Sequence, residues 1–225
     1  MFVHSELKIP IGLFLKDPLQ SKLGKKIISH SIILMEEIGF EAFTFKKLAK
    51  AMDSNETSLY RYFENKHLLL LFLVNWYLEW VNYLITLNTR NVNDPKLKLK
   101  IIIHSFVAAH KENPNVEYVN ESKLHNIVIS EGMKAYHTKD VDDENSKGFF
   151  QSYKNLTTSV SKVISEVNPN FKYPYALATN LFEMSNNSIY FAQHLPTLTD
   201  ISIKENEVIE VENMLMYFTN KLLKE

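Results

Sequence analysis

The segment NETSLYRYFENKHLL, residues 55–69, gathers hydrogen-bond donors and positive charges among aromatic rings. Its hydroxyl, guanidinium and ammonium groups are of the kinds that donate to phosphate oxygens or to the edges of bases. They belong to Thr57, Ser58, Tyr60, Arg61, Tyr62 and Lys66. The alternative is that the rings pack in a core. It explains Tyr60 and Tyr62 together less well, because residues two apart on a helix are separated by about 200° and cannot share one buried face.

Two short helices are predicted to position these side chains. Thr44 suits the N-cap of a helix over 45–52, and the Asp-Ser-Asn sequence at 53–55 suits a turn before a second helix over 56–63. Two such helices joined by a tight turn form a helix-turn-helix, whose second helix lies in the DNA major groove.

Spacing also predicts which side chains of the motif are buried. Leu59 and Phe63, four residues apart, are predicted to hold the second helix against its neighbours. Leu48, Ala49 and Met52 are predicted to do the same for the first helix. Lys46 and Lys66 are predicted to contact phosphates. If the motif binds a protein instead of DNA, both lysines should be replaceable without loss.

The stretch AFTFKKLAKAMDSNETSLYRYFENKHLLL, residues 42–70, resembles the signature of the TetR/AcrR family of bacterial transcription regulators. The preceding EEIGFEAF also resembles the lead-in to that signature, so the resemblance covers roughly residues 21–70. The matching positions are Thr44, Leu48, Ala49, Ser58, Leu59, Tyr60, Tyr62, Phe63, Lys66 and Leu69.

The resemblance implies an all-α regulator with an N-terminal arm at 1–20, a helix-turn-helix domain at 21–65 and a helical effector-binding and dimerisation domain at 66–225. It implies a homodimer on a palindromic double-stranded DNA operator, with repression favoured and activation left open. The implied DNA-binding residues are Thr44, Lys46, Glu56, Thr57, Ser58, Tyr60, Arg61, Tyr62 and Lys66.

Two features depart from the family pattern. The usual glycine of the turn is replaced by Asp53, which tolerates left-handed backbone better than most residues. Glu56 brings a negative charge towards DNA, unless it serves the helix N-terminus. Between residues 21 and 67, eight Lys and Arg face six Asp and Glu, so tight binding requires the positive charges on one face and two copies of the motif.

The last two predicted helices carry near-heptad apolar stripes that suit a dimer interface. Packing within one chain is the alternative. The predicted interface residues are Leu177, Leu181, Met184, Ser188, Val211, Leu215, Phe218 and Leu222.

The effector is predicted to be an apolar or aromatic small molecule, because aromatic residues recur on the apolar helices. Ordinary core packing is the competing interpretation for each of them. The candidate residues are Trp76, Trp80, Tyr83, His104, Phe106, His125, Tyr153 and Phe182.

Composition and the absence of certain motifs limit the classes of protein that the sequence can represent. Hydrophobic residues make up 45% of the 225, five residues are glycine and none is cysteine, which favours a helical protein of the reducing cytoplasm. The sequence contains no phosphate-binding glycine loop and no metalloprotease or serine-hydrolase motif, so no enzyme activity, cofactor or metal is predicted. A helical enzyme or ligand carrier is the minor alternative.

Two segments need a separate interpretation. Residues 68–87 have the length of a membrane span, but Asn75, Glu79, Asn82 and Thr86 fall on one helical stripe, which favours a helix of a soluble protein. The arm at 1–20 has an apolar patch interrupted by Pro10 and Gly12. It is predicted to lie on the domain surface, with a disordered tail as the alternative.

Overall fold

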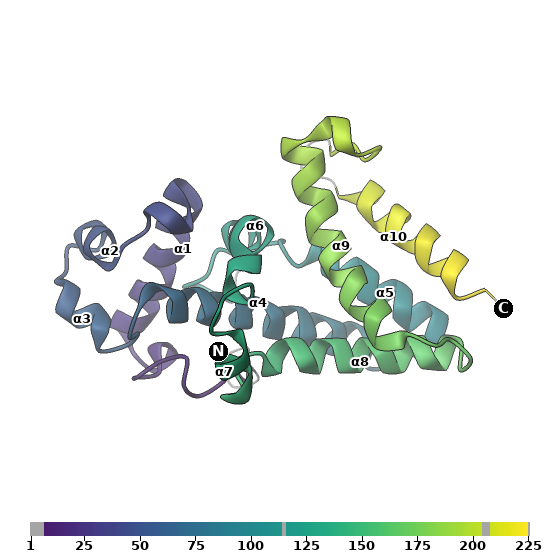
Figure 1. Ribbon diagram of the computed structural model, residues 1–225, viewed down its shortest axis with the longest axis horizontal. Coiled ribbons are helices and arrows are strands. Elements are labelled where there is room, and N and C mark those ends of the chain that lie inside the picture. The colour runs from purple at the N-terminus through teal and green to yellow at the C-terminus, as the bar shows by residue number, and fades with distance from the viewer. Residues whose placement is uncertain (1–6, 114–115, 204–207, 225) are drawn as a thin grey trace. The chain divides into compact units, whose positions relative to one another are not determined.

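The computed structural model describes residues 7–113, 116–203 and 208–224, and every regular element in them is helical (Figure 1). The predicted all-α fold is confirmed. Short 3-10 turns, η2, η3 and η4, cover Pro18–Gln20, Gly132–Ala135 and Pro196–Leu198. The α-helices are α1 Lys22–Ala42, α2 Phe45–Ala51, α3 Glu56–Tyr60, α4 Lys66–Thr89, α5 Pro95–Ala108, α6 Glu121–Glu131, α7 Val141–Ser146, α8 Gln151–Val167, α9 Pro174–His194 and α10 Ile209–Leu222.

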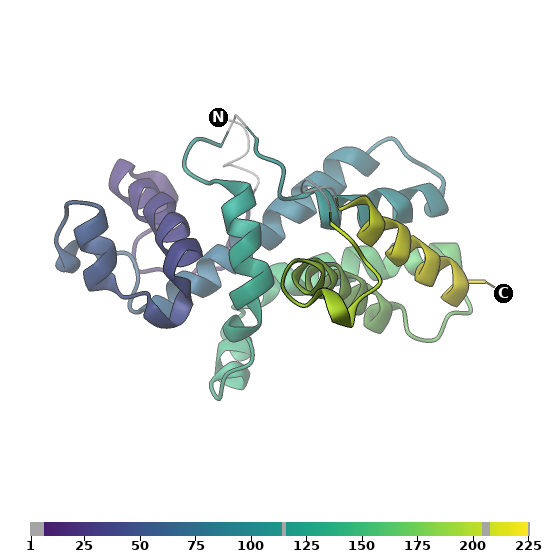
Figure 2. The same cartoon turned by 90° about the horizontal axis from the view of Figure 1, so that it is seen from above.

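The chain divides into two compact units. The first contains the described residues up to Trp80 together with His110–Ser152, and the second contains Val81–Ala109 and the described residues from Tyr153 onward. This division does not follow the predicted boundary at residue 65. The reason is that α6, although distant in sequence, packs against α1 (Figure 2).

Helix α1 is delimited by an N-terminal capping residue and by a glycine near its C-terminus. Ser21 caps it by accepting a hydrogen bond from the Gly24 N–H at 3.0 Å. Gly39 has φ 73°, a conformation that only glycine adopts readily, so the regular helix breaks there. The stripe between these points is buried and contains Ile27, Ile28, Ser31, Ile32 and Met35.

Helix α4 is a core helix. It is long and apolar enough to cross a membrane, but 78% of its most apolar window is buried inside the protein. Its predicted polar stripe is not a solvent-facing stripe throughout, because Asn75 and Glu79 are buried. The Asn75 side-chain amide donates to the Leu71 and Phe149 carbonyls at 2.8 and 3.0 Å, which satisfies its donors inside the core.

The described part of the N-terminal arm, from residue 7, packs on the first unit. Leu13 is fully buried, and the Phe14 ring meets the Phe72 ring edge-on at 6.1 Å. The Leu15 N–H donates to the Tyr62 carbonyl at 2.8 Å, which attaches the arm directly to the end of the helix-turn-helix. Residues 1–6 of the predicted arm lie outside the described residues.

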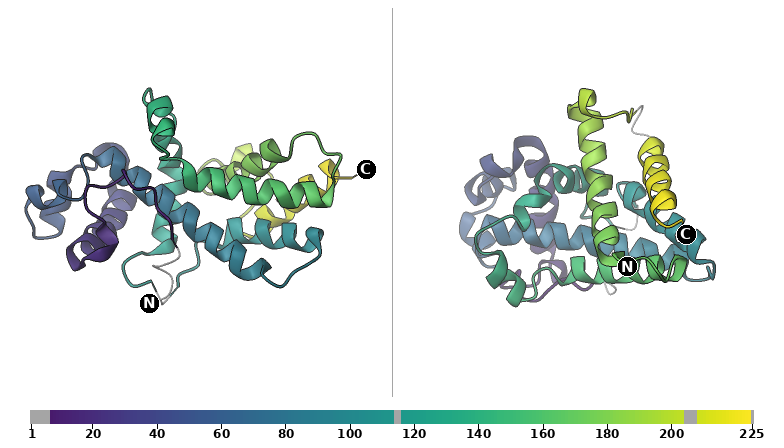
Figure 3. Two further views of the ribbon diagram at one scale, coloured as in Figure 1. Left: turned by 90° about the horizontal axis from the view of Figure 1, so that it is seen from below. Right: turned by 45° about the vertical axis from the view of Figure 1, so that its right-hand side comes forward.

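The second unit brings α5, α9 and α10 together, and α9 and α10 run in opposite directions beside each other (Figure 3). Their contact follows from the predicted stripes. Leu177, Leu181, Val211 and Leu215 are all buried, and the Phe106 and Phe182 rings meet at 5.4 Å.

Candidate nucleic-acid interface

The helix-turn-helix has the predicted apolar interior. Leu48, Leu59 and Phe63 are fully buried, and Met52 is almost so. Thr44 caps α2 by accepting a hydrogen bond from the Lys47 N–H at 3.2 Å, as predicted. Helix α3 ends at Tyr60 rather than at Phe63, because the chain turns after it: the Tyr62 and Phe63 N–H groups both donate to the Leu59 carbonyl.

The turn between α2 and α3 survives without the usual glycine. Asp53 adopts φ 50°, the left-handed conformation that aspartate tolerates. The Lys26 ammonium donates to the Met52 carbonyl at 2.6 Å, and Asn55 caps α3 by accepting from the Ser58 N–H at 2.9 Å. These contacts fix the angle between the two helices.

The outward face of the motif presents donors from both helices. On α3 it carries exposed Thr57, with exposed Arg61 four residues later on the same face. On α2 and its cap it carries exposed Thr44 and Lys46. Within the described residues, Lys46 and Arg61 form no internal hydrogen bond or ion pair, so both charges are available to an external partner.

Tyr60 lies at the edge of this outward face, 47% exposed. Its ring packs edge-on against Phe45 at 5.0 Å, and its hydroxyl donates to Glu56 Oε1 at 3.2 Å. This hydrogen bond to Glu56 raises the pKa of the Tyr60 hydroxyl, with burial as a smaller cause. The Tyr60 proton is therefore committed within the free protein, whereas its oxygen can still accept.

Tyr62 was predicted to face outward, and the structure corrects this. It is only 3% exposed, and its hydroxyl shares a 2.8 Å hydrogen bond with the Ser21 hydroxyl. The Lys16 ammonium lies 5.4 Å from its ring centroid. Because α3 ends at Tyr60, the 200° helical separation assumed for Tyr60 and Tyr62 does not apply, and Tyr62 turns inward.

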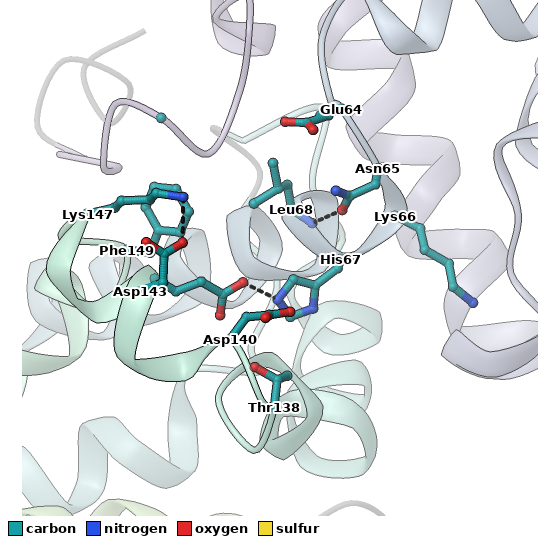
Figure 4. Close-up of a pocket in the computed structure, with 12 residues that line it drawn as sticks. Glu64, Asn65, Lys66, His67, Leu68, Thr138, Asp140, Asp143, Lys147 and Phe149 are labelled. Carbon is teal, nitrogen blue, oxygen red and sulfur yellow. Dashed lines mark hydrogen bonds and ion pairs between the residues drawn. The ribbon is translucent and has the colours of Figure 1, made fainter.

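Lys66 also has a different role from the predicted phosphate contact. Its ammonium donates to the carbonyls of Phe40, Glu41 and Phe43 at 2.9, 3.1 and 3.2 Å and lies 4.5 Å from the Phe40 ring centroid. An ammonium has three N–H donors, so these carbonyls use all of them. Lys66 thus caps the end of α1 and points away from its neighbour His67 (Figure 4).

Ser58 and Lys50 are the two remaining polar residues of the motif to be placed. The Ser58 hydroxyl donates to the Asn55 side chain at 2.9 Å, so the predicted DNA donor is occupied in the free protein. Lys50 was not predicted as a contact, yet it is exposed on α2. Its spacing of four from Lys46 places both lysines on one helical face, which the sequence could have shown.

The predicted effector residues are distributed over the two units. Trp76, Trp80 and His125 are buried in the first unit: the two indoles stack at 6.0 Å, and His125 stacks on Tyr77 at 5.4 Å. These contacts are core packing, the competing interpretation for all three.

In the second unit, Phe182 is buried against the half-buried Tyr153, whose hydroxyl donates to Glu183. Tyr83 is half-buried. His104 is not in the predicted apolar setting: its side chain is half exposed and its Nδ1 lies 2.7 Å from Glu212 Oε2. His104 is exposed because it lies on the outer face of α5, opposite the buried Ile102, Ile103 and Phe106.

The predicted dimer residues also separate into two groups. Leu177, Leu181, Val211 and Leu215 are buried within their own unit, because the stripes of α9 and α10 face α5 and each other. They are therefore intrachain core residues. Met184 and Ser188 are half-buried, and Phe218 and Leu222 are exposed, so only these four remain accessible to a second copy.

An open cleft of about 790 Å³ adjoins the motif within the first unit (Figure 4). His67 Nε2 and Glu144 Oε1 are 2.7 Å apart on its wall, and Lys147 pairs with Asp143 at 2.6 Å. The hydrogen bond of Lys147 to Asp143 raises the pKa of the Lys147 ammonium. Of these two contacts only His67–Glu144 joins the start of α4 to α7, because Lys147 and Asp143 both belong to α7 and its C-cap.

This geometry defines a helix-turn-helix of the kind that places its second helix in the DNA major groove. Residues 27–71 match the family model of bacterial regulatory proteins of the tetR family. Residues 27–71 therefore form a helix-turn-helix domain of the tetR family of bacterial regulatory proteins.

Solved structures share the fold at low sequence identity. AibR, in complex with isovaleryl coenzyme A and operator DNA, is 12% identical, with a TM-score of 0.59 over 86% of this chain and 97% of that one. The fatty acid degradation regulator FadR from Bacillus halodurans is 16% identical, with a TM-score of 0.58 over 88% and 93%. The superantigen PfiT is 12% identical, with a TM-score of 0.61 over 92% and 97%. No curated protein matches the sequence.

Proposed function

We propose that the chain is a homodimeric, one-component transcription regulator of the cytoplasm that represses by binding a palindromic operator and is released by a small-molecule effector. The observation that carries this proposal is the outward face of the helix-turn-helix. There Thr44, Lys46, Lys50, Thr57 and Arg61 offer unused donors on the two helices that the fold brings to DNA.

The contacts divide by function. Thr44, Lys46 and Lys50 suit the phosphate backbone, since they lie on α2 and its cap, and the first helix of such a motif crosses the backbone. Thr57 on α3 and Arg61 at its C-cap suit base edges, since the second helix of such a motif enters the groove. Tyr62 and Lys66 are positioning residues that hold α3 and α1.

The effector is proposed to bind in the helical region after the motif. Proteins of similar fold suggest its chemistry: AibR forms a complex with isovaleryl coenzyme A, and FadR is a regulator of fatty acid degradation. An apolar effector also suits the aromatic cluster of the second unit, where the rings of Phe106, Tyr153 and Phe182 pack together. Helix α4 is proposed to carry the signal, because the one helix, Lys66–Thr89, starts directly after the helix-turn-helix and extends to residues of the second unit.

The test is binding to the DNA that flanks the protein's own gene, at two salt concentrations. We expect tight binding that weakens steeply with salt, because phosphate contacts release counterions. A Lys46→Ala/Arg61→Ala variant should bind at least about tenfold more weakly and with a smaller salt dependence. A Lys154→Ala/Lys172→Ala variant removes two exposed charges from the second unit and should bind like the wild type.

Equal binding by the two double variants would contradict the proposed surface. If no DNA from that region or from a random-sequence pool is bound, the motif must serve a protein partner instead.

A further inference from the structure

Glu56 is a carboxylate on a surface that faces a polyanion. It is the first residue of α3 and is partly exposed, beside Thr57 on the outward face. Within the described residues, no cation forms an ion pair with it. Its negative charge should weaken binding to any DNA phosphate nearby, so a site that retains it needs a compensating contact.

The carboxylate is held in place by its own motif. Tyr60 donates its hydroxyl proton to Glu56 Oε1 at 3.2 Å, and the Tyr60 ring is fixed against the buried Phe45 ring at 5.0 Å and 63°. One oxygen of Glu56 is thus occupied, and the other is left to accept from an external donor. The chain Phe45–Tyr60–Glu56 orients an acceptor at the groove-facing start of α3.

The hydrogen-bonding groups on the base edges determine which base can pair with the Glu56 carboxylate. An ionised carboxylate can only accept hydrogen bonds. In the major groove, guanine presents two acceptors and thymine an acceptor and a methyl group, so neither suits it. Cytosine presents its N4 amino donor, whereas adenine sets its amino donor beside the N7 acceptor, which repels a carboxylate.

We infer that Glu56 reads the N4 amino group of a cytosine in each operator half-site and that Tyr60 positions it. The inference rests on the proposed function, and it specifies one base of the operator that the proposed regulator would bind. A purely local explanation competes with it, in which Glu56 only complements the N-terminus of α3. That explanation predicts an effect on stability and none on base preference.

Selection of bound sequences from a random-sequence duplex pool separates the two. Wild type should enrich one cytosine per half-site. Glu56→Gln, which keeps the shape of the side chain, should change that base to adenine, because an amide accepts from N6 and donates to N7. Direct titration should show a reversal of about tenfold or more between cytosine and adenine operators, since one mismatched pair typically costs about that factor or more.

Two further variants act as controls. Glu64→Gln removes an exposed carboxylate that lies beyond the end of α3, and it should keep the cytosine while binding DNA somewhat more tightly. Tyr60→Phe keeps the ring contact with Phe45 but removes the hydroxyl. It should relax the preference at the cytosine position and leave the rest of the half-site unchanged.

A measurement on wild-type protein avoids any loss of folding in a variant. Replacing the selected cytosine by its analogue without the N4 amino group should weaken binding about tenfold. Unchanged affinity for that analogue, or a Glu56→Gln variant that selects the wild-type sequence, overturns the inference while leaving DNA binding intact. If folded wild type enriches no sequence at all, the proposed function fails and this inference fails with it.

Discussion

At the scale of single residues, the lysines of the motif differ in what their ammonium groups already bind. Lys66 donates to three carbonyls, Lys26 to the Met52 carbonyl and Lys47 to the Ala42 carbonyl. Lys46 and Lys50 are exposed and form no such bond within the described residues. Residues of one type therefore divide into those that hold the motif together and those that remain accessible to an external partner.

Replacing Lys66 with methionine should lower the free energy of unfolding by about 2 kcal/mol, because three carbonyls at the end of α1 lose a charged donor. Lys50→Met should leave stability within about 0.5 kcal/mol of wild type, since its side chain is exposed. Urea unfolding measures both.

The salt dependence of DNA binding should show the reverse pattern, with an effect of Lys50→Met and none of Lys66→Met. Lys50→Met should reduce the slope of log affinity against log salt by about one, and Lys66→Met should leave it unchanged. A reduced slope for Lys66→Met with unchanged stability would restore the phosphate contact predicted from the sequence.

Spacing could not have revealed the roles of Tyr62 and Lys66. The partner of the Tyr62 hydroxyl is Ser21, 41 positions away, and Lys66 binds carbonyls 23 to 26 positions away. Periodicity reports which face a side chain occupies but not which distant backbone meets that face. Thr44 and Leu59, whose roles depend on neighbours within four residues, were predicted correctly.

At the scale of elements, the N-terminal arm acts as part of the motif's support. Its Leu13 is fully buried, and the Leu15 N–H bonds the Tyr62 carbonyl, so the arm covers the junction where α3 ends. The apolar patch of the arm allowed a surface position to be predicted. The alternation between buried Leu13 and exposed Ile11 was not evident from the sequence.

Truncation of Leu13 to alanine should lower the free energy of unfolding by about 2–4 kcal/mol, because it leaves a cavity beneath the arm. Ile11→Ala is the matched control: Ile11 is 88% exposed, and its truncation should change stability by less than about 0.5 kcal/mol. Chemical denaturation measures the difference. Equal stabilities would mean that the arm is not packed in solution.

The start of α6 introduces a pH dependence. Glu121 is buried there, and burial raises its pKa above the ordinary carboxyl value. A raised folded-state pKa means that the folded protein binds this proton more tightly than the unfolded chain does, so Glu121 is unfavourable at neutral pH and less so as the pH falls through that pKa.

Glu121→Gln should therefore be more stable than wild type at pH 7, and the difference should shrink towards pH 4. Unfolding in urea at a series of pH values measures it. A Glu117→Gln variant, which removes an exposed carboxylate nearby, should show no such trend. If the stability difference between Glu121→Gln and wild type stays constant across the series, the pKa of Glu121 is not raised in the folded protein.

Helix positions were the most predictable elements. The Thr44 cap placed the helix predicted over 45–52 within one residue of α2, Phe45–Ala51. The helix predicted over 56–63 ends earlier, at Tyr60, because the Tyr62 and Phe63 N–H groups both turn to the Leu59 carbonyl. Periodicity located the apolar face of that helix, Leu59 and Phe63, but not the residue at which the helix ends.

At the scale of the whole molecule, an apolar stripe does not reveal which partner covers it. The predicted dimer stripe on α10 is buried in the chain's own core at Val211 and Leu215, whereas Phe218 and Leu222 are 40% and 53% exposed. A palindromic operator requires two copies of α3, so the proposed regulator needs an interface. The exposed apolar residues towards the end of α10 are the best remaining surface for it.

The dimer prediction therefore concerns Phe218 and Leu222 rather than the original stripe. A Phe218→Glu/Leu222→Glu variant should sediment as a monomer at concentrations where wild type is a dimer, because four buried like charges would oppose each other across a two-fold axis. Its affinity for a palindromic operator should fall about a hundredfold through loss of bivalency, while its affinity for an isolated half-site stays near that of wild type. Leu195→Glu/Leu198→Glu, which charges two exposed leucines at the opposite end of α9, should remain dimeric. A dimer that survives the α10 substitutions and is lost with the α9 pair would move the interface to the other end of α9.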